Sequence, residues 1–276
     1  MPEEMRAMDR QFVNIEKGLG PQGRIAVVRF DRGDNINALS QQAMRELRDV
    51  PREFEDDLET SVVILTGSAR AFSAGFDLKD GDGRARDGLP IGERIHRQRL
   101  GPKMCKAWQD MDQVTIAAIE GHCIGGGAAL VVSLDFRTCG RSAHFRIPEV
   151  ELGMNMSWGS IPRMLALMGP ARTKQAVILA SDRIGAAEAL EWGLVENVVE
   201  DGQALAASME FAGRIARQPP IPVRMSKASV NRLAHALDDL AAHMDADQNV
   251  LTGLTEDYKE GTAAFREKRK PSFKGR

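Results

Sequence analysis

Two glycine-containing turns are places where the backbone itself could do chemistry. The first lies in 71–78 (AFSAGFDL), and the second lies in 121–127 (GHCIGGG). Each follows a short apolar run, at 61–66 and 114–119, of the kind found in strands that are buried on both faces. Ligands of parallel sheets bind outside the carboxyl ends of the strands, so we expect a ligand site at these two turns.

The second turn ends in Gly125-Gly126-Gly127, which opens an apolar helix predicted to run through Ser133. Each glycine in a first helical turn sacrifices up to about 1 kcal/mol of helix propensity, so three in succession require a reason. One reason is that backbone N–H groups at a helix N-terminus, unobstructed by a Cβ, suit an anion or a developing oxyanion. The other is close packing of a buried helix. The residues alone leave both open.

Several other kinds of site are excluded by the residues present. A Walker loop would need Gly-Lys-Ser/Thr where Gly126-Gly127-Ala128 stands, neither of the two turns contains G-x-G-x-x-G, and G-x-S-x-G does not occur. His122 and Cys123 lie beside the glycines, but no further His, Cys or Asp spacing makes a zinc site. We therefore expect no metal, and we do not expect Cys123 to act as a nucleophile.

Composition limits the class of protein. The chain has 276 residues, 43% of them hydrophobic, which suffices for one large domain or a domain with an appended helical part. A net charge of −2 and a pI of about 6.3 argue against a nucleic-acid surface. Three cysteines without paired spacing favour reduced thiols, and neither a signal peptide nor a membrane span is readable. We expect a cytoplasmic protein with no membrane partner.

The predicted elements alternate between strands and helices in the first half, and helices alone follow. A hairpin is expected at 12–16 and 24–30, and further strands at 135–139 and 143–146. Gln218–Pro222 is predicted to be a linker, because its prolines cannot continue a helix. Helices are expected from the N-cap Ser40 to about residue 58, and at 91–111, 158–168, 171–180, 186–192, 203–217, 223–235, 237–250 and 255–268.

Both turns and three further segments resemble the motifs of the crotonase family, also called the enoyl-CoA hydratase/isomerase family. The resemblance extends over essentially the whole chain. It implies an α/β fold, a crotonase-like spiral of ββα units with a helical C-terminal region. Residues 1–200 would form the core that carries the CoA and oxyanion sites, and 201–276 would serve oligomerisation and pocket closure. The segments that carry the resemblance are 34–39 (DNINAL), 72–78 (FSAGFDL), 121–127 (GHCIGGG), 145–149 (FRIPE) and 186–195 (AAEALEWGLV).

The resemblance assigns roles to single residues. In that family two backbone N–H groups grip the oxygen of an acyl-CoA thioester, and they correspond here to Phe76 and Gly126. Trp158 begins a helix that should border the acyl pocket, with core packing as the alternative. Lys274 resembles the residue that approaches the CoA phosphates, whereas a solvated tail is the other interpretation of the basic C-terminus. The family's remaining CoA contacts correspond to Ala38, Ala74, Asp77, Leu78 and Gly125.

The acid–base residues depart from the hydratase pattern. One of the two hydratase glutamates falls at Ala129, the other is present as Glu149, and a third carboxylate position of the family falls near Ser157. From spacing alone, Glu149 could equally be a surface carboxylate. A 1,3 proton shift needs only one base, so the resemblance favours a Δ3,Δ2-enoyl-CoA isomerase. The alternatives are an enoyl-CoA hydratase, thioester hydrolysis or decarboxylation, and a non-catalytic acyl-CoA-binding protein.

The resemblance also implies partners. No cofactor is expected beyond the coenzyme A of the substrate, and the chain is expected to form a homo-oligomer, either a trimer or a dimer of trimers, with no nucleic-acid partner. The acyl group cannot be read from the sequence. Pocket depth should depend on side chains around 80–100 and on the final helices.

Overall fold

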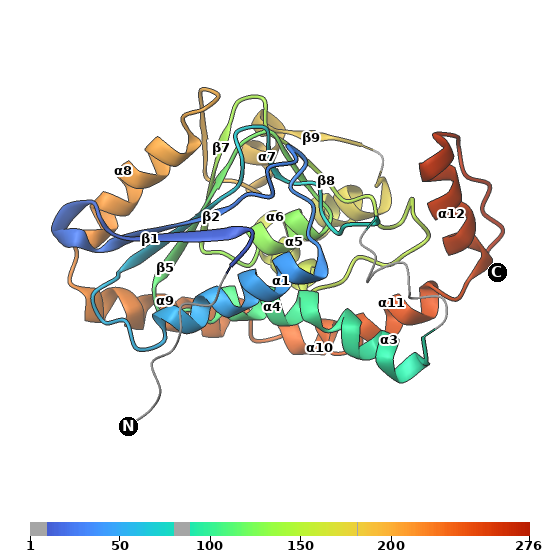
Figure 1. Cartoon of the computed structure of the whole chain (residues 1–276), viewed down its shortest axis with the longest axis horizontal. Coiled ribbons are helices and arrows are strands. Elements are labelled where there is room, and N and C mark those ends of the chain that lie inside the picture. The colour runs from blue at the N-terminus through green and yellow to red at the C-terminus, as the bar shows by residue number, and fades with distance from the viewer. Residues whose placement is uncertain (1–9, 80–88, 181) are drawn as a thin grey trace.

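The computed structural model describes residues 10–79, 89–180 and 182–276, and it arranges them as two sheets surrounded by helices (Figure 1). All described strand pairs are parallel except β1–β2 and β8–β9. The first sheet has the order β1 (Val13–Leu19), β2 (Ile25–Phe30), β3 (Val62–Thr66), β5 (Val114–Ile119), β7 (Phe136–Gly140) and β10 (Asn197–Val199). The second has the order β4 (Ala71–Ser73), β6 (His122–Ile124), β8 (His144–Arg146) and β9 (Ile184–Gly185).

From β3 to β8, consecutive strands alternate between the two sheets. The pairs β3–β4, β5–β6 and β7–β8 each lead from the first sheet to the second, and each pair is followed by helices. This is the predicted spiral of ββα units. The helices that follow the pairs are α3 (Ile91–Gln98) with α4 (Leu100–Gln109), α5 (Gly126–Val131), and α6 (Ser160–Ile178) with α7 (Ala186–Trp192).

Both faces of the first sheet are covered, which explains its continuous apolar strands. On one face α8 (Ala204–Ala216) packs Ala204 and Ala212 against the sheet, because small side chains let a helix approach closely. On the other face lie α1 (Gln41–Asp49) and α4, which are joined by a hydrogen bond from Trp108 Nε1 to Leu47 O at 2.9 Å (Figure 1). Side chains of the second sheet and of α5 belong to the same core cluster as this second face.

Two predicted helices in the first half are shorter than expected. Ser40 is the N-cap, as predicted, and its Oγ accepts from Ala43 N at 3.2 Å. The predicted extension to residue 58 is wrong, because Pro51 cannot donate within a helix and the chain forms a 3₁₀ turn at Val50–Phe54. The predicted helix 91–111 is divided into α3 and α4 at Arg99.

The second half also differs in detail. The predicted linker is wrong in part, since α9 (Pro220–Ala234) begins inside the proline run. A proline in the first turn of a helix replaces an N–H that would have no helical partner. The predicted helix 237–250 is two helices, α10 (Asp238–Ala242) and α11 (Asp245–Thr252). The predicted helices 158–168 and 171–180 form α6, whose backbone is non-helical at Gly169.

The helical end of the chain lies partly on the core and partly beside it. α8 belongs to the packing of the first sheet, while α12 (Glu256–Glu267) stands at the opposite end of the molecule (Figure 1). The proposed division at residue 200 stays a prediction. The polar stretch at 80–88 lies outside the described residues. Within the described parts of the chain, no helix combines the length and apolarity needed to cross a bilayer.

The buried Glu46 ties the N-terminal strand to α1. Its Oε2 accepts from Phe12 N at 2.9 Å and from Val13 N at 3.1 Å, and its Oε1 accepts from Gln11 N at 3.0 Å. We expect Glu46→Ala to lower the free energy of unfolding by about 2–3 kcal/mol, because buried donors would lose their charged acceptor. Urea unfolding measures this. Arg45→Ala, on the exposed face of α1, is the control, and equal losses in both variants would contradict the prediction.

Candidate active site

A cavity of about 230 Å³ lies where the two glycine turns meet. Its lining comes from both turns, from the loop between β8 and α6, and from α3, α11 and α12. The turns do not follow the long strands directly. The short strands β4 and β6 of the second sheet come first, and Phe76 and Gly125 follow them. Both β4 and β6 fall inside the turns predicted from the sequence, because three residues are too few to show the alternation of a strand.

The first turn is fixed by pairing with the segment before α1. Leu39 N donates to Gly75 O at 2.7 Å, and Asp77 N donates to Leu39 O at 3.1 Å. In such a parallel bridge, the residue between the two partners directs its own N–H away from the paired segment. The Phe76 N–H is therefore directed away from Leu39, and Phe76 lines the cavity.

Gly75 brings the first turn against the N-terminus of α5. Its φ is +81°, and a Cβ at this position would lie 2.6 Å from Ile124 O and 3.2 Å from Gly126 N. Gly126 is the first residue of α5, where N–H groups have no acceptor within the helix and the helix dipole is positive. Phe76 and Gly126 thus share one cavity, as the sequence predicted.

Glu149 lies beside the glycine triplet. A Cβ on Gly125 would lie 2.6 Å from Glu149 Oε1, so the carboxyl group packs directly on that backbone. Glu149 Oε2 is buried and accepts no hydrogen bond from the residues that the structure describes. Burial raises the pKa of the Glu149 carboxyl to about 7, although its own backbone N–H and the Arg146 guanidinium lower it in part. The alternative of a solvated surface carboxylate is therefore wrong.

The other acid–base positions carry no carboxylate. Ala129 and Ser157 line the same cavity, which places all three of the family's acid–base positions together. Glu149 is the one carboxylate among the described residues of the lining. Trp158 lines the cavity too and is 8% exposed, so it packs in the core, and its contact with an acyl group stays a prediction.

The predicted CoA contacts fall into two groups. Ala74, Leu78 and Gly125 line the cavity. Ala38 and Asp77 lie outside the lining, and Arg32 bridges them, with Nη1 donating to Ala38 O at 2.9 Å and to Asp77 Oδ2 at 2.7 Å.

Lys274 is also absent from the cavity lining of this single chain. It lies on the exposed C-terminal segment, where its backbone N–H donates to Asp257 Oδ1 at 2.7 Å. Its contact with phosphate stays a prediction.

Part of the lining lies outside the motifs, in the regions expected to set pocket depth, but its residues were not predicted individually. Gln98 of α3 donates to Asn249 of α11 at the cavity, and Phe265 of α12 also reaches it. These residues carry no motif, and only the tertiary fold brings them together. Cys123 is buried, and burial raises its pKa well above the usual value, so its thiolate is disfavoured. Among the described residues, no group of three or more His, Cys, Asp or Glu could hold a metal ion.

A spiral of ββα units whose glycine turns meet at one cavity defines a crotonase-fold protein. Comparison with known families agrees, since the model of the enoyl-CoA hydratase/isomerase family matches residues 20–276. The chain belongs to this family of enzymes.

Its relatives include the crotonyl-CoA hydratase of Syntrophomonas wolfei, 34% identical over 92% of this chain and 96% of the relative. The short-chain-enoyl-CoA hydratase of Clostridium acetobutylicum is 34% identical over 98% of this chain and 100% of the relative. Among solved structures, the enoyl-CoA hydratase of Bacillus anthracis aligns with a TM-score of 0.74 at 31% identity, covering 96% of this chain and 100% of that one.

The raised pKa of Glu149 predicts how stability depends on pH. The folded protein holds a proton up to about pH 7 that the unfolded chain releases near its ordinary pKa of 4.5. The stability that this proton contributes is fully present below pH 4.5 and is lost as pH rises through 7. Between pH 4.5 and 8, wild type should therefore lose roughly 3 kcal/mol relative to Glu149→Gln in urea unfolding.

The control for this measurement is the same change at an exposed glutamate of α8 that lies outside the cavity lining. Glu210→Gln should leave the pH dependence of wild type in place. Parallel stability curves for wild type and Glu149→Gln would contradict the assignment of a buried, protonated carboxyl.

Proposed function

We propose that this chain binds an acyl-CoA thioester with its carbonyl oxygen between the N–H groups of Phe76 and Gly126, and that Glu149 transfers a proton to and from the acyl carbons. One observation carries the proposal. The Glu149 carboxyl, whose buried Oε2 has no hydrogen-bond partner among the described residues, lies in the same cavity as the two turns. No cofactor is required beyond the coenzyme A of the substrate.

The chemistry explains why backbone groups suffice. Removal of a proton next to a thioester places negative charge on the thioester oxygen. Preorganised N–H donors in a water-excluded site stabilise this charge, each by about 3 kcal/mol in related oxyanion holes. A carboxyl with a pKa of about 7 can both accept and return a proton near neutral pH, which suits a general acid–base.

Geometry favours double-bond isomerisation of the Δ3,Δ2-enoyl-CoA type. One base removes a proton at C2 and returns it at C4, and the described lining offers one carboxylate for this task. The side chain of Ala129 stands where hydratases of the family carry their second glutamate. A methyl group cannot orient a water molecule.

Hydration of an enoyl-CoA is the second candidate, because both curated relatives described above are named hydratases. Their names give no specific support to isomerisation. Hydration here would require Glu149 alone to orient the water and to supply the proton. Thioester hydrolysis and decarboxylation would use the same two amides, but no particular contact favours them.

Exchange of the acyl-CoA alpha proton in deuterated water tests the shared chemistry without knowledge of the substrate. Wild type should exchange it, and Glu149→Gln should be at least 100-fold slower, because loss of a general base costs about 10²–10⁴. Glu210→Gln, at an exposed position of α8, serves as the control and should retain exchange. If wild type binds acyl-CoA but does not exchange the alpha proton, the chain is a non-catalytic acyl-CoA-binding protein.

Residue 129 separates the two candidate reactions. Wild type should convert a 3-enoyl-CoA into the conjugated 2-enoyl-CoA, seen as a gain of thioester absorbance, and should hydrate it poorly. Ala129→Glu should raise hydration at least tenfold over Ala129→Gln, which has similar size without the charge. Rapid loss of the conjugated absorbance with wild type would favour hydratase over isomerase.

A homo-oligomer, trimer or dimer of trimers, belongs to the same proposal. It is supported by large apolar side chains that are exposed along the C-terminal helices, since contiguous apolar surface marks interaction sites. These side chains are Ile221, Met225, Val230, Leu233, Leu237, Leu240, Met244 and Leu251.

A further inference from the structure

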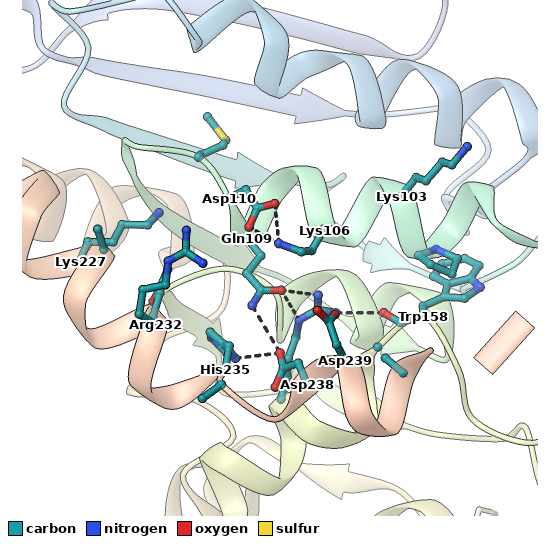
Figure 2. A pocket seen from close by; sticks show the side chains of 18 of the residues that line it. Lys103, Lys106, Gln109, Asp110, Trp158, Lys227, Arg232, His235, Asp238 and Asp239 are labelled. Carbon is teal, nitrogen blue, oxygen red and sulfur yellow. Dashed lines mark hydrogen bonds and ion pairs between the residues drawn. The ribbon is translucent and has the colours of Figure 1, made fainter. Parts of the chain in front are cut away.

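Trp158 forms a wall between two cavities. One is the candidate active site, and the other is a larger cavity of about 680 Å³ between α4 and the helices α9 and α10. Figure 2 shows Trp158 at one end of the larger cavity, whose lining includes the charged residues Lys106, Arg232 and Asp238. On the other side, the lining of the active-site cavity includes the apolar side chains of Met154 and Met156.

The indole ring is wedged between two helices that carry glycine where they face it. A Cβ on Gly126 would lie 2.5 Å from Trp158 Cζ3, and a Cβ on Gly101 of α4 would overlap Cε2. Neither helix could carry a side chain at these positions with the ring in place. The ring therefore lies directly on the residue proposed to bind the thioester oxygen.

The backbone of Trp158 is held in an uncommon conformation. Its φ of +65° lies in the left-handed region that bulky residues rarely adopt, so neighbouring groups must hold it there. Arg163 Nη1 donates to Trp158 O at 2.9 Å, and the Arg163 guanidinium is held by Gln109 Oε1. On the other side, Gly159 N donates to Asp245 Oδ2 of α11 at 2.7 Å. Three helices thus position this wall.

We propose that Trp158 is a specificity-determining residue that closes the acyl end of the active site and restricts the enzyme to short acyl chains. The inference rests on the proposed function. A cavity of about 230 Å³ is smaller than the range of about 300–1,000 Å³ common for ligand pockets. An alkyl chain that leaves a carbonyl held at Gly126 meets the indole ring within a few carbons. Beyond the ring lies a charged cavity, which does not suit an alkyl chain.

The test compares kcat/KM for enoyl-CoA substrates of four and twelve acyl carbons. Wild type should prefer the short substrate, and Trp158→Leu should lower the ratio of short to long at least tenfold. Trp158→Phe keeps an aromatic ring and makes a smaller change, so it should lower the ratio less. If Trp158→Leu does not fold, Trp158→Phe serves as the test in its place. Equal kcat/KM values for both lengths in wild type would overturn the inference without any variant.

Trp192 of α7 provides the matched control. It is buried to the same extent as Trp158, with 8% exposure, and it lines neither cavity. Trp192→Leu should leave the length ratio of wild type unchanged. Near-UV circular dichroism shows whether the Trp158→Leu and Trp158→Phe variants fold. If a folded variant keeps the wild-type ratio of short to long kcat/KM, Trp158 does not limit acyl length.

Calorimetric binding of saturated acyl-CoA esters of the same two lengths separates this inference from the proposed function, because it needs no turnover. Wild type should bind the short ester more tightly, and Trp158→Leu should reduce that preference at least tenfold. Failure of wild type to bind either ester would overturn the proposed function and the inference with it. Tight binding of the short ester with an unchanged preference in the variant would overturn the inference alone.

Discussion

The close approach between the first glycine turn and the N-terminus of α5 is the constraint on which the site depends. At Gly75 the backbone passes so near Ile124 O and Gly126 N that no side chain fits between them. The parallel pairing of β3 with β5, and of β4 with β6, brings the ends of these strands to the same place. Phe76 and Gly126 then line one cavity, and in the proposed function their main-chain amides stabilise the oxyanion.

Glu149 shows what the cavity does to a side chain placed inside it. A buried carboxyl oxygen without a hydrogen-bond partner opposes folding, and such groups are rare unless they have a function. The nearby cation does not neutralise it, because Arg146 is paired with Glu151 and its Nε donates to Ala180 O. The carboxyl responds with a pKa of about 7, the range in which a proton is readily moved in both directions.

The sequence predicted those parts of the site that are encoded locally. Both turns, Ala129 and Glu149 lie in short segments with fixed spacing, and the structure brings them to one cavity. Gln98 and Asn249 could not be predicted in this way, since they are 151 residues apart and meet only through the packing of α3 on α11. No pattern in either segment signals the other.

The errors in the fold have local causes of a different kind. The strands β4 and β6 are three residues long, too short for alternation to appear. Two prolines depart from the predictions in opposite ways. The helix that the apolar spacing extends to residue 58 ends before Pro51, whereas Pro220, in the predicted linker, begins a helix. In both cases the position of the proline relative to the first turn decided the outcome, because only there is its missing N–H harmless.

The number of carboxylates in so small a cavity affects the pKa of each one. A second carboxylate at residue 129 would repel Glu149, and one of the two pKa values would rise further, as happens whenever like charges share a site. With alanine there, Glu149 titrates alone, and its pKa is set by burial and by Arg146. A lone carboxyl near neutrality can take a proton from one carbon and return it to another. In the proposed function, the backbone amides of Phe76 and Gly126 stabilise the enolate, whereas the side chains at 129 and 158 set the reaction that follows and the acyl groups that fit.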